Sequence, residues 1–257
     1  MGRSLLLLTP DSNPVVRILF FPHAGGTALH LRAWAERLPP FVQLLGVRYT
    51  AWDNPAAQIA PRTSQSIVAD LVADIVAQSD RPMIFFGYSL GALIAYETCV
   101  ELCGRGIDSP AELVVAASRA PDQPRREVSV TELTDAELIA RLRHYGGTPE
   151  SVLQDPDLLD ALLPAIRADF SVVDSYRMTQ PMRLRCPITA MAGNTDPLAT
   201  VDAVGAWRSR TTSTFNLHRF AGGHFFLHEQ PQRVLSIVES LANRYVTNAR
   251  DALDGRH

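Results

Sequence analysis

The sequence predicts an α/β fold with a mostly parallel central sheet and helices on both faces. Short apolar runs alternate along the chain with segments whose apolar residues recur at helical spacing, as in consecutive β-α-β units. The runs are nearly continuous in apolar residues, which is typical of strands covered on both faces. With 257 residues, 46% of them hydrophobic, we expect one domain over residues 1–257.

The candidate strands are short and end in loops rich in glycine, proline or polar residues. They cover residues 17–21, 43–49, 83–86, 113–117, 188–192 and 214–219. Between them, residues 67–77 and 231–245 each show one apolar face at helical spacing, and a further helix is expected after Ser89. The order of these segments predicts parallel neighbours in the sheet.

Residues 121–181, which we call the lid segment, interrupt this alternation. Helical patterns cover 133–144, 157–166 and 168–176, and Thr134 with Glu137 is a capping-box start for the first. A connection of this length between two strands is expected to have structure of its own, here a helical lid. Its apolar residues either pack on the core or cover an acyl chamber (Leu138, Leu142, Leu158, Leu159, Leu162, Leu163 and Ile166). Its arginines form either a basic rim or an ordinary solvated face (Arg125, Arg126, Arg141, Arg143 and Arg167).

Composition narrows the class of protein. A formal charge of -3 gives no reason to expect a nucleic-acid partner. The apolar run at 4–8 is too short for a signal peptide, and no stretch approaches the roughly 18 apolar residues of a membrane helix. The three cysteines show no disulfide framework. We therefore expect a cytoplasmic protein without a membrane partner.

The stretch Gly87-Tyr88-Ser89-Leu90-Gly91 is a G-x-S-x-G motif between a predicted strand and a predicted helix. A sharp turn there exposes the serine oxygen at the carboxyl end of the strand, and the flanking glycines avoid collisions. The N-terminus of the helix directs free N–H groups at the same point. The pattern predicts Ser89 as a nucleophile, the alternative being a glycine-rich turn that arose by chance.

A base is expected in Phe220-Ala221-Gly222-Gly223-His224, a loop that follows the strand at 214–219. His224 is the candidate, and His218 and His228 are the alternatives. A metal pair of His224 and His228 would have no third ligand, so we expect no metal and no bound cofactor.

Asp196, in the loop after the strand at 188–192, is the candidate acid that would orient the base. Asp122, after the strand at 113–117, is the alternative acid. Asp196 could also have a purely structural role, as a turn residue before Pro197. For the oxyanion hole we expect the backbone N–H groups of Ala24 and Leu90. His23, just before Ala24, is expected to line the site.

The motifs FFPHAGG, FFGYSLGALIAYE, CPITAMAGNTDP and FAGGHFFL, in this order, resemble those of type II (editing) thioesterases of non-ribosomal peptide and polyketide synthesis. The resemblance implies an α/β-hydrolase fold with Ser89, Asp196 and His224 as catalytic triad. It also implies hydrolysis of acyl groups from the phosphopantetheine arm of carrier domains, which clears stalled or misprimed chains. The partner would be an acyl- or peptidyl-carrier domain, and we expect a monomer.

Two positions depart from the family pattern. Tyr88 and Leu90 stand where histidine and methionine are common, a change that keeps the N–H of residue 90, and Asn194 stands where an aspartate is common. The second departure strengthens Asp196 as the acid. A general carboxylesterase or lipase, a chain-releasing cyclase and a non-catalytic binding module are the alternative functions.

Overall fold

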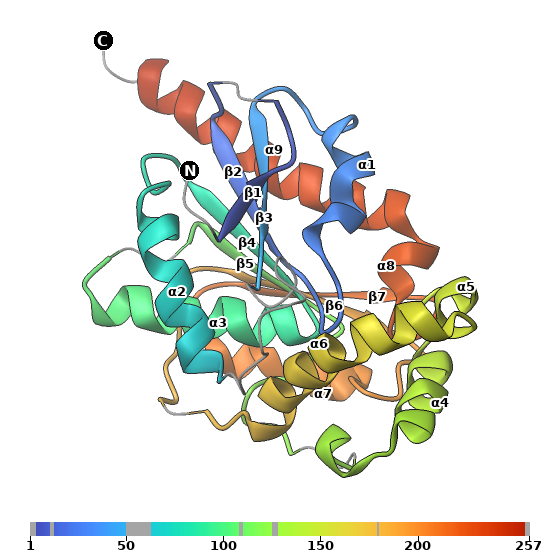
Figure 1. Cartoon of the computed structure of the whole chain (residues 1–257). Helices are drawn as coiled ribbons and strands as arrows, with labels where there is room; N and C mark the ends of the chain where they lie inside the picture. The colour runs from blue at the N-terminus through green and yellow to red at the C-terminus, as the bar shows by residue number, and fades with distance from the viewer. Residues whose placement is uncertain are drawn as a thin grey trace.

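The structure is a computed structural model that describes residues 4–10, 13–49, 63–107, 110–124, 128–178 and 180–254. Its centre is a seven-stranded sheet in the order β1-β3-β2-β4-β5-β6-β7 (Figure 1). Every neighbouring pair is parallel except β1 with β3, which is antiparallel. The predicted α/β class with a mostly parallel sheet is therefore confirmed.

The predicted strands are all present, and none of their ends is displaced by more than two residues. They are β2 (Val16–Phe21), β3 (Val42–Val47), β4 (Met83–Tyr88), β5 (Glu112–Ala116), β6 (Ile188–Gly193) and β7 (Phe215–Phe220). Strand β1 (Leu5–Leu7) was not predicted. It has only three residues and is defined by its pairing with β3, in which Leu6 lies opposite Gly46.

Alternating residues of the strands pack into two separate core clusters, one on each face of the sheet. Phe85 of β4 faces the first cluster, whereas its neighbours Ile84 and Phe86 face the second. The first face is covered by α2 (Ser64–Val76), α3 (Leu90–Gly104), α7 (Val201–Gly205) and the 3₁₀ turn η4 (Ala206–Arg210). The second is covered by the 3₁₀ turn η1 (Ala28–Leu31), α1 (Arg32–Ala35), α8 (Phe226–Glu229) and α9 (Pro231–Asp254). Among the helices described, none is long and apolar enough to cross a membrane.

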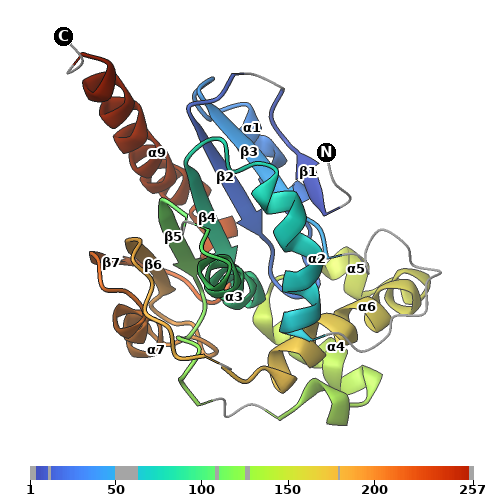
Figure 2. The ribbon, with the colours of Figure 1, turned by 90° about the vertical axis from the view of Figure 1, so that its left-hand side faces the viewer.

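The lid segment holds a 3₁₀ turn, η3 (Val130–Glu132), and the helices α4 (Asp135–Tyr145), α5 (Glu150–Leu153) and α6 (Pro156–Ser175). These helices gather at one end of the molecule, and the far end of α9 extends in the opposite direction (Figures 1 and 2). The predicted capping box of α4 is confirmed, since Thr134 and Glu137 bond each other's backbone N–H groups. The expectation of two helices over 157–166 and 168–176 is wrong, because α6 is continuous through both.

The lid helices have a small apolar core of their own. It consists of Val130, Leu138, Leu142, Leu153, Leu159, Leu163 and Ile166. The continuity of α6 agrees with its buried stripe, which continues past residue 167 at helical spacing from Ile166 to Asp169 and Val172. Leu158 lies outside the stripe with 46% of its surface exposed. Most of the apolar lid residues therefore pack on one another.

Candidate active site

Ser89 occupies the turn between β4 and α3 in a strained backbone conformation. Its φ of 54° and ψ of -114° are rare for a residue with a side chain. A Cβ on Gly91 would lie 1.9 Å from the carbonyl oxygen of Phe21, and one on Gly87 would lie 2.4 Å from the Cα of Ala92. Both glycines of the motif are thus required by the close approach of α3 to β2 and β4. This packing holds the Ser89 hydroxyl at the carboxyl end of the sheet.

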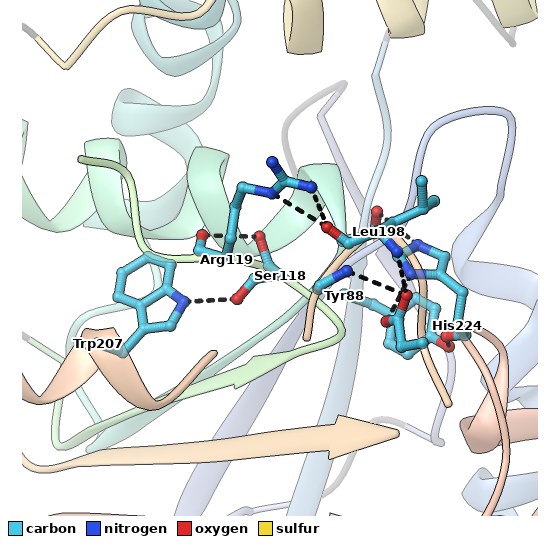
Figure 3. A network of polar contacts seen from close by, with 9 residues as sticks. Tyr88, Ser118, Arg119, Leu198, Trp207 and His224 are labelled. Carbon is cyan, nitrogen blue, oxygen red and sulfur yellow. Dashed lines mark hydrogen bonds and ion pairs between the residues drawn. The ribbon is translucent and has the colours of Figure 1, made fainter. Parts of the chain in front are cut away.

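His224 lies in the loop after β7, and its ring is directed at Ser89. The Nε2 atom of His224 is 3.0 Å from Oγ of Ser89. The hydroxyl of Tyr88 donates a hydrogen bond to the backbone carbonyl of His224, and this bond connects β4 to the loop (both residues are labelled in Figure 3). Burial raises the pKa of Tyr88 well above its ordinary value, so this donor stays protonated. Tyrosine at this position therefore has a contact of its own with the base loop.

Asp196 lies in the loop after β6, with its side chain fully buried. One carboxylate oxygen, Oδ2, is 2.8 Å from Nδ1 of His224. The other oxygen, Oδ1, accepts hydrogen bonds from the N–H groups of Leu198 and Ala199 at 2.8 and 3.0 Å. A carboxylate at Nδ1 requires the proton on that nitrogen, which leaves the lone pair of Nε2 facing Ser89.

The two loops that carry Asp196 and His224 are bonded to each other. The N–H of Asn194 donates to the carbonyl of Phe220 at 2.8 Å, and that of Thr195 donates to Gly222 at 3.0 Å. A Cβ on Gly193 would lie 2.3 Å from the carbonyl oxygen of Gly223. Direct backbone packing therefore holds the acid beside the base.

The loop after β5 supports the same site from the other side. Arg119 donates from Nε to the carbonyl of Leu198 at 3.0 Å, and Trp207 donates to the carbonyl of Ser118 at 2.8 Å (Figure 3). Asp122, the alternative acid in this loop, instead forms an ion pair of 3.0 Å with Arg210. Of the two candidate acids, the structure brings Asp196 to His224.

The other histidines take different positions. His228 stacks on the ring of Phe225, with centroids 5.8 Å apart, and His218 lies half-buried on β7. His23 lines the cavity beside Ser89 and is buried. Burial, together with His30, His228 and His224, holds the pKa of His23 well below its usual range, so its ring is neutral. Among the described residues, no group of three or more histidine, cysteine, aspartate or glutamate side chains is arranged to hold a metal ion.

Ala24 and Leu90, the expected oxyanion donors, both line a cavity of about 80 Å³ that contains Ser89 and His224. Leu90 is the first residue of α3, where backbone N–H groups have no acceptor within the helix. Ala24 belongs to residues 22–26, which we call the oxyanion loop. The oxyanion loop follows β2, so it reaches the same edge of the sheet as the serine.

A second cavity of about 140 Å³ lies next to the first and shares His23, Ala24, Tyr145, Phe170 and Phe225 with it. Its remaining walls include the lid residues Leu142, Val152, Leu162 and Ile166. Of the apolar lid residues considered for a chamber, only Leu142, Leu162 and Ile166 line one of these two cavities.

Two of the lid arginines are balanced by carboxylates. Arg143 pairs with Glu150 at 3.0 Å and Arg167 pairs with Asp135 at 2.6 Å. Arg141 lines the cavity of Ser89 and donates to the carbonyl of Val128 at 2.6 Å. Arg125 and Arg126 lie outside the described residues.

Two residues at the site were not expected from the sequence. Asp169 of α6 accepts a hydrogen bond from the N–H of Gly25, and the hydroxyl of Tyr49 donates to the carbonyl of Pro22. A signal existed for Asp169, because it interrupts the apolar stripe of α6 three residues after Ile166 and three before Val172. An acid on a buried stripe needs a polar partner.

The chain is similar to known proteins over most of its length. Residues 16–242 match the family model described as Thioesterase domain. The chain is 35% identical over 246 residues to Thioesterase PikA5 of Streptomyces venezuelae. The aligned region covers 94% of this chain and 86% of that protein.

Two solved structures are similar over nearly their whole length. BorB, the type II thioesterase from the borrelidin biosynthetic cluster, has a TM-score of 0.85 and 33% identity, over 93% of this chain and 97% of BorB. YbtT, a type II thioesterase from the yersiniabactin NRPS/PKS pathway, has a TM-score of 0.82 and 26% identity, over 94% of this chain and 99% of YbtT. The α/β-hydrolase fold implied by the sequence motifs is confirmed. Because the family match covers most of the chain, this protein belongs to the thioesterase family.

Proposed function

We propose that this protein is an editing type II thioesterase that hydrolyses acyl groups from the phosphopantetheine arm of carrier proteins or domains. The observation that carries the proposal is the continuous path from Asp196 through His224 to Ser89, with distances of 2.8 and 3.0 Å. The similarity to type II thioesterases of biosynthetic clusters supports the substrate class. In this role the enzyme clears stalled or misprimed chains from a synthase.

In the proposed mechanism, Nε2 of His224 takes the proton of Ser89 as Oγ attacks the thioester carbonyl. The negative charge on the former carbonyl oxygen is held by the N–H groups of Ala24 and Leu90. The carbon–sulfur bond then breaks, the pantetheine thiol leaves with the proton from His224, and the acyl group remains on Ser89. His224 then deprotonates a water molecule that attacks the acyl-enzyme. The ester bond to Oγ of Ser89 breaks, His224 returns the proton to that oxygen, and the free acid leaves. Asp196 stabilises the imidazolium form of His224 in both steps.

The chemistry needs no cofactor, because the reacting groups are all supplied by the chain and the substrate carries its own pantetheine arm. We propose a cytoplasmic enzyme that acts as a monomer on a carrier domain. The cavity of Ser89 would receive the thioester, and the adjoining cavity beneath Leu142, Leu162 and Ile166 would receive the acyl chain.

The proposal predicts that a carrier domain loaded with short acyl groups loses them in the presence of this protein. Ser89→Ala should reduce the rate by about 10⁶-fold, because loss of the nucleophile removes the acyl-enzyme route. Intact-protein mass spectrometry of the carrier follows the release. Retention of most activity in the variant would exclude Ser89 as nucleophile.

The alternative functions give different products or preferences in the same assay. A general esterase would cleave the matched oxygen ester as well as the carrier thioester. A cyclase would release a ring without taking up oxygen from isotopically labelled water, whereas hydrolysis puts one labelled oxygen into the acid. A binding module would not react with a serine-directed phosphonate at all.

A further inference from the structure

The lid helix α6 contributes a buried carboxylate to the oxyanion loop. Asp169 is 3% exposed, and its Oδ2 accepts a hydrogen bond of 2.9 Å from the backbone N–H of Gly25. Gly25 has a φ of +74°, in the left-handed region that favours glycine. A charged acceptor makes this bond stronger than one between neutral groups. It joins two segments that are 144 residues apart in the chain.

A second side chain holds the loop on the other side of Ala24. The hydroxyl of Tyr49, which follows β3 and is 2% exposed, donates to the carbonyl of Pro22 at 3.0 Å. Burial and the nearby charge of Asp169 raise the pKa of Tyr49 well above its ordinary value, so the hydroxyl keeps its proton. The backbone is therefore held at Pro22 and at Gly25, with only His23 and Ala24 between.

We infer that Asp169 is a positioning residue that keeps the N–H of Ala24 aimed at the reacting carbonyl, so that the oxyanion hole is complete only when α6 is seated. The inference rests on the proposed function and adds a role that the lid plays in catalysis itself. Oxyanion donors act over a narrow range of distance, about 2.7–3.1 Å to the developing charge. If α6 moves away, Gly25 loses its acceptor and the adjacent Ala24 is no longer held there.

The same arrangement explains why an acid is kept on the apolar stripe of α6. Leu163 and Ile166 precede it on the stripe and pack in the lid core. A carboxylate in such a place costs free energy unless it is partnered, and the N–H of Gly25 is one such partner. The bond between Asp169 and Gly25 thus connects the lid helix to the oxyanion loop.

The test compares Asp169→Ala, Asp169→Asn and Tyr49→Phe with wild type on an acyl thioester. We expect Asp169→Ala to lower kcat by about tenfold or more with KM changed by less than about twofold, since the lost contact acts on the transition state. Asp169→Asn retains an acceptor oxygen and should recover part of that loss. Tyr49→Phe should act in the same direction, because it frees the other side of the loop.

A trifluoromethyl ketone analogue of the substrate distinguishes positioning from a general structural effect. Its adduct with Ser89 places an oxyanion in the hole, so its inhibition constant should rise by the same factor as kcat falls. Affinity for the free acid product should not change. Asp160→Ala is the matched control, because Asp160 lies on the same helix with an exposed side chain, and it should behave as wild type.

The inference would be overturned if Asp169→Asn and Tyr49→Phe left both kcat and the inhibition by the ketone unchanged, while Asp169→Ala was either as active as wild type or unfolded. So would a loss of kcat without weaker inhibition by the ketone. Failure of the proposed function looks different, because wild type would then release no acyl group from carriers in a Ser89-dependent reaction.

Discussion

At the scale of single residues, the site depends on backbone positions as much as on reactive side chains. Ser89 can adopt its conformation because Gly87 and Gly91 leave room for α3 to approach β4 and β2. The positions of Ser89, Asp196 and His224 were predictable, since each lies within four residues of the end of a strand and the carboxyl ends of parallel strands meet at one edge.

Asp196 and Asp122 provide a matched pair of substitutions. We expect Asp196→Asn to lower kcat by on the order of 10⁴-fold, because an amide facing Nδ1 favours the wrong tautomer of His224. Asp122→Asn should leave kcat within about twofold, since Asp122 pairs with Arg210 and the carboxylate bonded to His224 belongs to Asp196. Steady-state kinetics on one acyl thioester measures both. A large loss only in Asp122→Asn would transfer the role of acid to Asp122.

At the scale of elements, the lid helices form a unit with its own apolar cluster, distinct from the two clusters on the sheet. Units of this kind can open without unfolding the rest of a protein. The helical content of the lid was predictable from its periodicity and its capping box. Its continuity at α6 was not, because Asp169 interrupts the apolar pattern between Ile166 and Val172, and only the folded structure shows that this acid is buried with them.

A substitution at a helix cap tests whether the lid opens independently. Thr134→Ala removes the capping box of α4 and should destabilise that helix by about 1 kcal/mol. Limited proteolysis should then cut the lid several times faster, while the urea midpoint of the whole protein changes little.

The control is the equivalent cap of α2, which packs on the main sheet. Thr63→Ala removes the capping box of Thr63 with Ser66, and α2 contributes Ile67 and Leu71 to the larger core. This variant should lower the urea midpoint without faster cutting of the lid. Equal effects of the two variants on the midpoint would mean that lid and sheet unfold together.

At the scale of the whole molecule, a group of histidines links stability to pH. The rings of His23, His30 and His228 lie 5.5 to 6.3 Å apart, and burial lowers the pKa of all three. The unfolded chain therefore binds more protons than the folded chain once the pH falls below about 6.5. Their contribution to stability is complete at higher pH and is lost as the pH falls from there.

We predict that the free energy of unfolding decreases between pH 7 and pH 5.5, at up to about 1.4 kcal/mol per pH unit for each histidine that remains neutral in the fold. Burial raises the pKa of Glu97 and Glu112, which acts in the opposite direction. His23→Asn isolates the histidine contribution, and its slope should be shallower than that of wild type. Urea unfolding at several pH values measures both slopes, and equal slopes would contradict the prediction.

The sequence by itself determined where the candidate site residues and the lid lie along the chain. These are a serine on a strand-to-helix turn, an aspartate and a histidine in loops after later strands, and a helical segment between β5 and β6. These features follow from periodicity and from the steric demands of glycine and proline, which act over a few neighbouring residues. Only the tertiary structure decided that Asp122 pairs with Arg210, that Arg143 and Arg167 are balanced by carboxylates, and that Asp169 reaches Gly25. Such contacts join segments far apart in the chain, so they depend on how the helices pack and not on any local pattern.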